Sequence, residues 1–168
     1  MKKESIAVYP GTFDPVTYGH IDLIKRASNI FDKVIVAVAH SRSKGALFSV
    51  EERVSMLKDA VKGIRNVVID DFDGLVVEYV KKKGSNVMIR GLRMISDFEY
   101  EFQMALTNRK LAGDIETIFM MPHEDYSYVS SKLIKEAASL GADVGNFIPP
   151  KAKAALKEKL QKERRGRA

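Results

Sequence analysis

The chain has 168 residues, 45% of them apolar, with no Cys and a formal net charge of +6. This length predicts one domain with a sizeable buried core. The absence of Cys excludes a disulfide scaffold, a thiolate metal site and a Cys nucleophile. Neither a long uncharged apolar run nor a signal-peptide pattern occurs, so we expect a cytoplasmic protein without a membrane partner.

The positive charge lies at the C-terminal end of the chain. Residues 151–168 contain eight basic and two acidic side chains, so residues 1–150 are neutral overall. Nucleic-acid-binding domains usually present basic residues as a stripe across a folded face. We therefore expect one domain over residues 1–150, a basic C-terminal helix over 151–168 that frays from Arg164, and no nucleic-acid partner. The competing interpretation from another class is a nucleic-acid-binding module that acts through this tail.

The first predicted element is a strand over residues 5–9, an apolar run that Pro10 and Gly11 close. Apolar residues then recur at helical spacing, at Ile21, Ile24, Ala27 and Phe31. The loop between them lies at the carboxyl end of its strand, where open parallel sheets bind ligands. Gly11 allows the backbone to approach a ligand closely, and Thr12 offers a hydroxyl group.

Thr17 is a candidate N-cap, which would place His20 in the first turn of the helix that follows. Free N–H groups and the positive end of the helix dipole would then surround the imidazole, and such a place suits a phosphate. Taken alone, a histidine at this position is more often a surface residue without a ligand.

Two strands and a helix are predicted next. Residues 33–39 form a near-continuous apolar run, typical of a strand covered on both faces, and residues 66–70 form a shorter run. Ser49 and Glu52 make a capping box that predicts a helix start. We expect the charged side chains of this helix, Glu51, Arg53 and Lys58, on its solvated face.

Cationic residues follow two of the predicted strands. Lys44 lies in the polar loop after residues 33–39, where it could reach an anionic substrate or remain a solvated loop lysine. A helix over 75–83 leads to a fourth strand at 87–89, which ends in Arg90, Gly91, Leu92 and Arg93. Arginine suits bidentate recognition of phosphate, although two isolated arginines are more often solvated or salt-bridged.

Ser96 and Glu99 form a second apparent capping box, which predicts a helix to about residue 110. We expect a core-facing side made of Phe98, Phe102, Ala105 and Leu106. Glu101, Met104 and Asn108 share another side, and spacing alone leaves open whether that side is ordinary surface or the lining of a cleft.

The last strand is predicted over residues 116–121, where Pro122 stops it. After a polar loop, Ser130 is a natural N-cap for a helix that contains Leu133 and Ile134. A second helix N-terminus would thus offer hydroxyls, N–H groups and Lys132 to an anion, or would simply be a well-capped helix.

These motifs carry a family resemblance. Gly11-Thr12-Phe13-Asp14-Pro15 followed by Thr17-Tyr18-Gly19-His20 resembles the first signature of the nucleotidyltransferases. Ile-Arg-Gly-Leu-Arg with Asp97-Phe98-Glu99-Tyr100-Glu101 resembles a distinctive run of the bacterial phosphopantetheine adenylyltransferases, and the resemblance covers residues 6 to about 149. Val129-Ser130-Ser131-Lys132 is similar to their second signature, in which a small hydroxyl residue usually stands in place of Lys132.

Five strands alternating with helices predict an α/β fold with a parallel sheet and right-handed crossovers. The resemblance implies a Rossmann-like sheet of order 3-2-1-4-5 with helices on both faces and a C-terminal helix. That order would bring the first loop and the Arg90 loop to the switch point of the sheet, where both face one cleft.

The activity implied by the resemblance is transfer of the adenylyl group of ATP to 4′-phosphopantetheine, giving dephospho-CoA and pyrophosphate in coenzyme A biosynthesis. The sequence offers neither a convincing metal-ligand cluster nor an activated nucleophile, and an anionic substrate phosphate needs no general base. Mg²⁺ is the implied cofactor, held by ATP phosphates and water. A homohexamer and feedback by coenzyme A are also implied. Within the class, glycerol phosphate or nicotinamide mononucleotide is the alternative acceptor.

The resemblance also implies roles for individual residues. The catalytic set is His20 and Thr12 at the α-phosphate, with Lys44 and Arg93. The acceptor would be held by Thr12, Lys44, Val76, Arg90, Met104 and Asn108. ATP would be bound by Thr12, Phe13, His20, Gly91, Leu92, Arg93, Glu101, Tyr126, Ser127, Tyr128, Val129, Ser130, Ser131 and Lys132.

Overall fold

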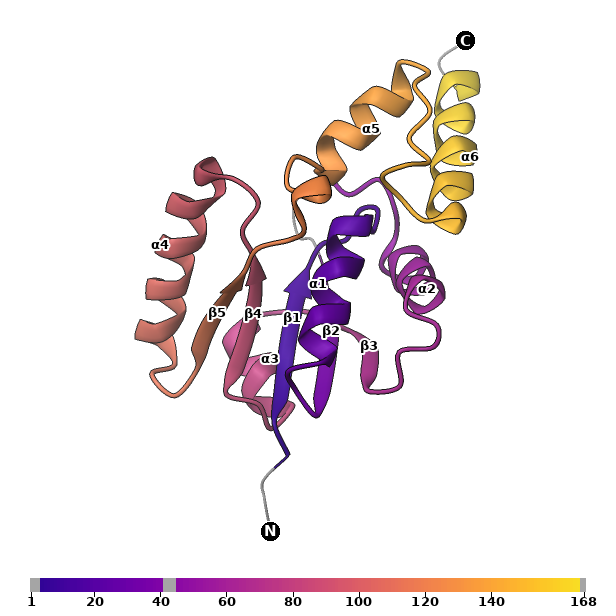
Figure 1. Cartoon of the computed structure of the whole chain (residues 1–168). Coiled ribbons are helices and arrows are strands. Elements are labelled where there is room, and N and C mark those ends of the chain that lie inside the picture. The colour runs from indigo at the N-terminus through magenta and orange to yellow at the C-terminus, as the bar shows by residue number, and fades with distance from the viewer. Residues whose placement is uncertain (1–3, 41–44, 167–168) are drawn as a thin grey trace.

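The structure is a computed structural model that describes residues 4–40 and 45–166. Over these residues the chain forms one parallel sheet in the order β3-β2-β1-β4-β5, which confirms the implied strand order. The strands are β1 (Ile6–Gly11), β2 (Lys33–Ala39), β3 (Val67–Phe72), β4 (Val87–Gly91) and β5 (Glu116–Met120). Figure 1 shows the arrowheads of β1 and β4 pointing toward the end of the molecule that carries the C-terminus.

Helices cover both faces of the sheet. Two helices, α1 (Tyr18–Ser28) and α2 (Val50–Ala60), pack on one face, and α3 (Val76–Lys82) and α4 (Ile95–Leu111) lie on the other. A 3₁₀ turn, η1 (Glu124–Tyr126), then leads to α5 (Ser131–Ser139) and α6 (Pro150–Gly166) beyond the carboxyl ends of the strands (Figure 1). Within the described ranges, none of these helices is both long and apolar enough to cross a membrane.

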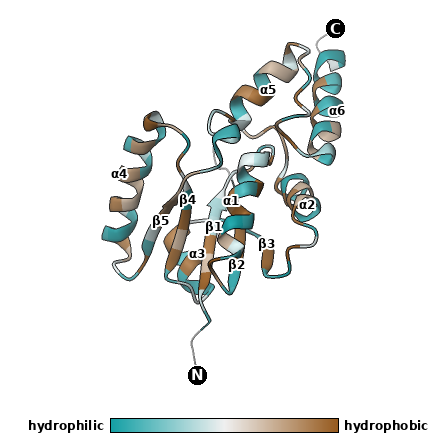
Figure 2. Ribbon diagram, in the orientation of Figure 1, coloured by the Kyte–Doolittle hydropathy of each residue, from teal (hydrophilic) through white to brown (hydrophobic). Residues whose placement is uncertain are grey.

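The central strands explain why their sequences are apolar without interruption. Ala7 and Tyr9 of β1 enter the core under α1 and α2, whereas Val8 between them enters the core under α3. Because both faces of β1 and β2 are covered, alternate residues are buried on opposite sides, and the strands read as continuous apolar runs. In Figure 2 the first half of β1 is brown, whereas its arrowhead is pale.

Three of the four predicted helix caps are confirmed. The side chains of Thr17, Ser49 and Ser130 accept hydrogen bonds from the backbone N–H three residues later, at the starts of α1, α2 and α5. The capping box predicted at Ser96 is wrong, because α4 has Met94 as its N-cap and no side-chain capping bond.

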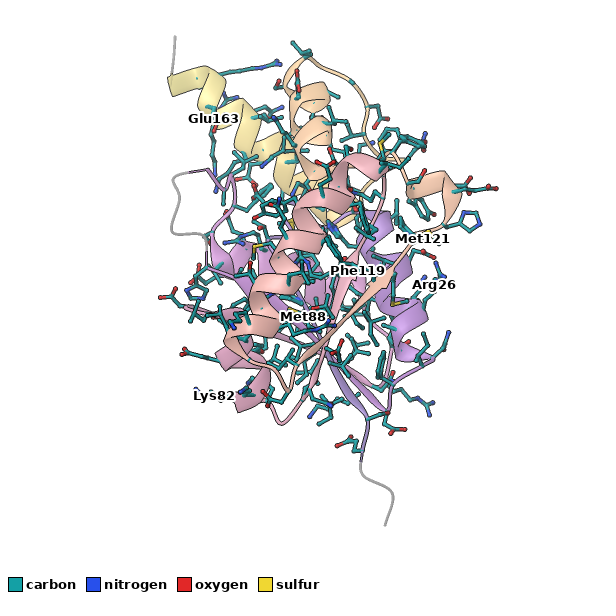
Figure 3. The ribbon with its side chains drawn as sticks, turned by 90° about the vertical axis from the view of Figure 1, so that its left-hand side faces the viewer. Arg26, Lys82, Met88, Phe119, Met121 and Glu163 are labelled. Carbon is teal, nitrogen blue, oxygen red and sulfur yellow. The ribbon has the colours of Figure 1, made fainter. Side chains whose placement is uncertain are left out.

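The predicted core-facing side of α4 is also wrong. Phe98, Phe102 and Leu106 are 47%, 46% and 48% exposed, while the buried side chains of this helix are Glu101 and Asn108. Glu101 forms two hydrogen bonds to Arg90 at the end of β4, and the side of α4 that carries Glu101 and Asn108 faces inward. In Figure 3, α4 lies in front of the sheet, and its outer side faces the viewer.

The basic C-terminal segment is a docked helix. Helix α6 continues through Gly166, past the point where we expected fraying, and buries Ala152 and Leu156. Its basic residues reach neighbouring elements, since Lys159 pairs with Glu52 of α2 and the guanidinium of Arg164 donates to a carbonyl of α5. Figure 2 shows the hydrophilic colour that dominates α6. Much of the charge of this segment therefore attaches it to the domain.

Candidate active site

A cleft of about 540 Å³ opens at the carboxyl end of the sheet, between the first loop, the end of β4 and the start of α5. It is located at the switch point, because β1 pairs with β2 on one side and with β4 on the other. Just after β5, the carbonyl of Met121 accepts a 2.5 Å hydrogen bond from the side chain of Arg26 in α1 (Figure 3). The loop that follows β5 is thereby held against α1.

A second cavity of about 220 Å³ adjoins the cleft on the α3 and α4 face. Val76, Met104 and Asn108 line it, as the expected acceptor channel requires. Thr12 and Arg90 line both the cleft and this cavity. Two molecules bound in the two spaces would therefore meet beside these two residues.

His20 is held by the cap of its own helix. Its Nδ1 accepts a 3.0 Å hydrogen bond from the backbone N–H of Thr17, so the neutral ring carries its proton on Nε2. Burial, followed by the positive charges of Arg93 and Arg90, lowers the pKa of His20 to about 4. His20 lines the cleft, and it is therefore a neutral hydrogen-bond donor near pH 7.

Phe13 packs the imidazole from the side. Its backbone has a φ of 51°, an uncommon conformation for a residue with a side chain. The ring lies edge-on to His20 with 5.0 Å between centroids and edge-on to Tyr9 with 5.4 Å. A Cβ added at Gly11 would lie 2.9 Å from this ring, so glycine is needed there for close packing.

Arg90 is occupied by two partners. Its Nε and Nη2 donate to the Glu101 carboxylate at 2.8 and 2.5 Å, and its Nη1 donates to the Pro10 carbonyl at 2.9 Å. Burial acts to lower the pKa of Arg90, but the Glu101 carboxylate outweighs it and raises that pKa. The guanidinium is therefore a permanent, oriented positive charge between the cleft and the second cavity.

Arg93 joins the β4 loop to the start of α5. Its Nε donates to Asp97 at 3.1 Å, and its Nη1 donates to the carbonyl of Val129 at 3.0 Å. The hydroxyl of Ser131 donates to the Pro15 carbonyl at 2.7 Å, which ties the same helix start to the first loop. The two sequence signatures are thus in direct contact around the cleft.

Most of the predicted site residues line one of the two spaces. The cleft is lined by Thr12, Phe13, His20, Arg90, Gly91, Arg93, Glu101, Tyr126, Val129, Ser130, Ser131 and Lys132. Leu92, Ser127 and Tyr128 adjoin these residues in sequence but do not line either space. The binding role of every residue in these sets stays a prediction. Lys44 lies outside the described residues.

The sequence analysis missed three charged residues near the site. Asp14 accepts hydrogen bonds from the N–H groups of Leu47 and Phe48, both at 2.9 Å, and pairs with Lys135, whose side chain also lines the cleft. Arg53, which we expected on the solvated face of α2, is only 2% exposed, and that expectation is wrong. Asp14 belongs to the first signature, but its partners come from distant segments, and no local pattern marks Arg53 or Lys135.

The carboxylates that line the cleft, Asp14 and Glu101, are both engaged by basic side chains. In the ranges 4–40 and 45–166, no group of three or more His, Asp or Glu side chains is arranged to hold a metal ion. These donors do not fit a protein-held Mg²⁺, which prefers free carboxylate oxygens or the oxygens of a bound phosphate.

Known proteins resemble this chain along nearly its whole length. A family profile described as "Cytidylyltransferase-like" matches residues 8–137. A phosphopantetheine adenylyltransferase of Caldanaerobacter subterraneus subsp. tengcongensis is 55% identical over 94% of this chain and 98% of the relative. The protein of the same name from Desulfitobacterium hafniense (strain Y51) is 52% identical over 94% of this chain and 97% of the relative.

Solved structures of lower identity share the fold. The Plasmodium falciparum nicotinic acid mononucleotide adenylyltransferase has a TM-score of 0.68 at 14% identity, over 96% of each chain. A structure from Vibrio parahaemolyticus reaches 0.70 at 19% identity, over 96% of this chain and 97% of that one. The geometry of the cleft and the high identity of the bacterial relatives lead to one conclusion: the chain belongs to the phosphopantetheine adenylyltransferase family of the nucleotidyltransferases.

Proposed function

We propose that this protein transfers the adenylyl group of ATP to 4′-phosphopantetheine, with dephospho-CoA and pyrophosphate as products. Family membership supports the substrates. The main support for the chemistry is the position of His20. Its helix cap holds it as a neutral hydrogen-bond donor in a cleft that also contains Arg90 and Arg93. Such a constellation stabilises charge on phosphate oxygens and supplies no nucleophile of its own.

The reaction is a direct displacement at phosphorus. An oxygen of the 4′-phosphopantetheine phosphate attacks the α-phosphorus of ATP in line, and a new P–O bond forms. The bond between the α-phosphorus and the oxygen that bridges to the β-phosphorus breaks, and pyrophosphate leaves with that electron pair. The attacking phosphate is already anionic at neutral pH, so the protein contributes positioning and charge stabilisation instead of proton abstraction.

His20 and Thr12 act at the α-phosphate in this proposal. The Nε2–H group of His20 donates a hydrogen bond to an oxygen whose negative charge grows in the transition state. Its low pKa keeps the ring neutral, so the donor does not depend on protonation near pH 7. Arg93 supports the charge that develops on the departing pyrophosphate.

ATP is bound by the β4 loop and the start of α5. Arg93 and the Ser130 and Ser131 hydroxyls receive the β- and γ-phosphates at the helix N-terminus, where backbone N–H groups add donors. Lys132, exposed at the same helix start, adds a cation. Mg²⁺ would enter as part of the MgATP substrate, held by phosphate oxygens and water, and would neutralise charge on ATP.

The acceptor occupies the second cavity. Arg90 holds the phosphate of 4′-phosphopantetheine beside Thr12, and Lys44 is assigned to the same phosphate from the sequence resemblance alone. Val76, Met104 and Asn108 line the channel for the thiol arm. The mixture of aliphatic, thioether and amide groups matches an arm that contains both methylene and amide groups.

The assembled protein is proposed to be a cytoplasmic homohexamer, which feedback by coenzyme A would regulate. The outer side of α4 supports association, because Phe98 and Phe102 stack on each other with 5.5 Å between centroids and remain almost half exposed. Large adjoining apolar side chains on a surface mark protein contacts.

The function is tested by pyrophosphate release from MgATP with 4′-phosphopantetheine, nicotinamide mononucleotide or glycerol 3-phosphate as separate acceptors. We expect release with 4′-phosphopantetheine alone. Release only with another acceptor would keep the chemistry but reject the proposed substrate. No release with any of them would reject the enzyme and favour the alternative function through the basic helix.

A further inference from the structure

Tyr9 of β1 has a buried hydroxyl group without a hydrogen-bond partner in the described part of the chain. The residue is 5% exposed, and over residues 4–40 and 45–166 its hydroxyl neither donates nor accepts a hydrogen bond. A buried hydroxyl that lacks a partner costs free energy, and phenylalanine would fill the same space without this cost. The oxygen atom of Tyr9 therefore calls for a reason outside the folded core.

The hydroxyl of Tyr9 is open to the active-site cleft. Among the described residues, every polar side-chain atom that is fully enclosed has a partner. The Tyr9 oxygen has none, so it is not fully enclosed and keeps contact with open space. Because Tyr9 lines the cleft of about 540 Å³, that open space is the cleft.

The position of the hydroxyl is fixed by its neighbours. The ring of Tyr9 packs edge-on against Phe13, which in turn packs against His20. The hydroxyl oxygen lies 3.6 Å from the point that a Cβ on Gly91 would occupy. It is therefore beside the backbone at the end of β4, where the proposed ATP-binding loop begins.

The two substrates differ in their access to Tyr9. Thr12 and Arg90 line both the cleft and the second cavity, whereas Tyr9 lines the cleft and not the cavity assigned to 4′-phosphopantetheine. Burial raises the pKa of the Tyr9 phenol above its ordinary value, although Arg90 and Arg93 oppose this rise. The hydroxyl thus stays protonated, as a hydrogen-bond donor that faces the ATP side.

We propose that Tyr9 is a further ATP-binding residue, whose hydroxyl donates a hydrogen bond to the nucleotide beside Gly91. This inference rests on the proposed function. Solvent in the open cleft is the other partner within reach of the hydroxyl, and ATP replaces it with an acceptor oxygen or nitrogen. The bond forms when ATP binds, so it acts on the affinity for ATP.

The test compares Tyr9→Phe with Tyr79→Phe, since each change removes one oxygen and keeps the ring. Tyr79 is a matched control because it is also buried, with 8% exposed, but its hydroxyl donates to Asp70 at 2.7 Å and it lines neither space. For each variant we would measure the Kd of MgATP by calorimetry and the KM for 4′-phosphopantetheine. Urea unfolding without ligand measures stability.

We expect Tyr9→Phe to raise the Kd of MgATP by about 3- to 15-fold, the loss of one hydrogen bond. Its KM for 4′-phosphopantetheine should match that of the parent, and its unfolding midpoint should be equal or higher, because an unpartnered buried group is removed. Tyr79→Phe should show the opposite pattern, with a lower midpoint and an unchanged Kd of MgATP.

Three results for Tyr9→Phe would overturn the inference. These are an unchanged Kd of MgATP, a weaker Kd that accompanies a lower unfolding midpoint, and a loss confined to the KM for 4′-phosphopantetheine. A parent protein that neither binds MgATP nor releases pyrophosphate would instead overturn the proposed function, and this inference with it.

Discussion

His20 combines a local structural role with a chemical one. Its Nδ1 completes the cap of α1 through Thr17, and this bond leaves the proton on the other nitrogen. Burial, followed by the Arg93 and Arg90 charges, opposes protonation and lowers the pKa of the ring. One imidazole is therefore oriented by helix capping and kept neutral by its surroundings, and both effects favour a hydrogen-bond donor.

The first prediction concerns the titration of His20. We expect a midpoint of about 4, well below the usual value near 6.5, because burial and the two arginines disfavour the imidazolium. The folded state thus binds this proton less readily than the unfolded chain. Its contribution to stability should be complete above about pH 6.5 and should be lost as the pH falls toward 4.

The titration is followed by NMR of the imidazole Cε1–H resonances. The chain has three histidines, so the His20→Ala variant identifies the resonance of His20. A midpoint near 6.5 for His20 would contradict the electrostatic account, because the ring would then be partly charged at neutral pH.

The structural roles of some residues can be predicted from the sequence, and those of others cannot. Thr17 and His20 could be predicted because a capping pattern involves residues only three positions apart. Arg53 could not, since its partners Thr12 and Ala39 lie 41 and 14 positions away. From the sequence, an arginine in the first turns of a charged helix looks solvated.

Helix α4 also has features that the sequence predicts and features that it does not. Its existence and length could be read from the sequence, but its orientation could not. The pattern assigns the apolar side to the core, whereas the structure places the side with Glu101 and Asn108 inward, where Glu101 pairs with Arg90. The periodicity of α4 does not reveal this buried ion pair, because its partner Arg90 lies on another element.

The second prediction follows from the exposed apolar side of α4. Phe98→Asp should convert a hexamer into smaller species, because a carboxylate would have to lose its water to enter an apolar interface. Light scattering coupled to size-exclusion chromatography measures the mass. Gln103→Asp adds the same charge to an exposed position of the same helix and should leave the assembly intact.

Two results would contradict this assignment. A parent protein that is monomeric would reject the homohexamer altogether. A Phe98→Asp variant that remains hexameric would move the interface to another surface.

At the scale of the whole molecule, the fold brings the two signatures together. The alternation of strands and helices predicted an α/β fold, while the strand order came from the family resemblance. That order puts β1 beside β4, so residues about 80 positions apart, such as Pro10 and Arg90, come within hydrogen-bond distance. Pairing of distant strands is not encoded in any local pattern, so sequence reasoning from residues alone could not supply it.

The C-terminal helix belongs to this whole-molecule arrangement. Leu156 is 1% exposed and lies in the same core as α2 and α5 residues. The third prediction is that Leu156→Ala lowers the free energy of unfolding by about 2–5 kcal/mol, because a cavity replaces a packed side chain. Urea unfolding at equilibrium measures this loss.

A control separates packing from charge. Lys157→Ala changes the neighbouring exposed residue and should stay within about 0.5 kcal/mol of the parent. Equal stability of Leu156→Ala and the parent protein would mean that α6 does not contribute to the folded domain in solution.

The central claim is that a neutral His20 stabilises the transition state of adenylyl transfer, and the turnover of His20→Ala tests it most directly. With saturating MgATP and 4′-phosphopantetheine, we expect kcat to fall by roughly two to three orders of magnitude, as when one preorganised oxyanion donor is lost, while the Kd of ATP changes little. A variant that turns over at the rate of the parent protein would contradict the account.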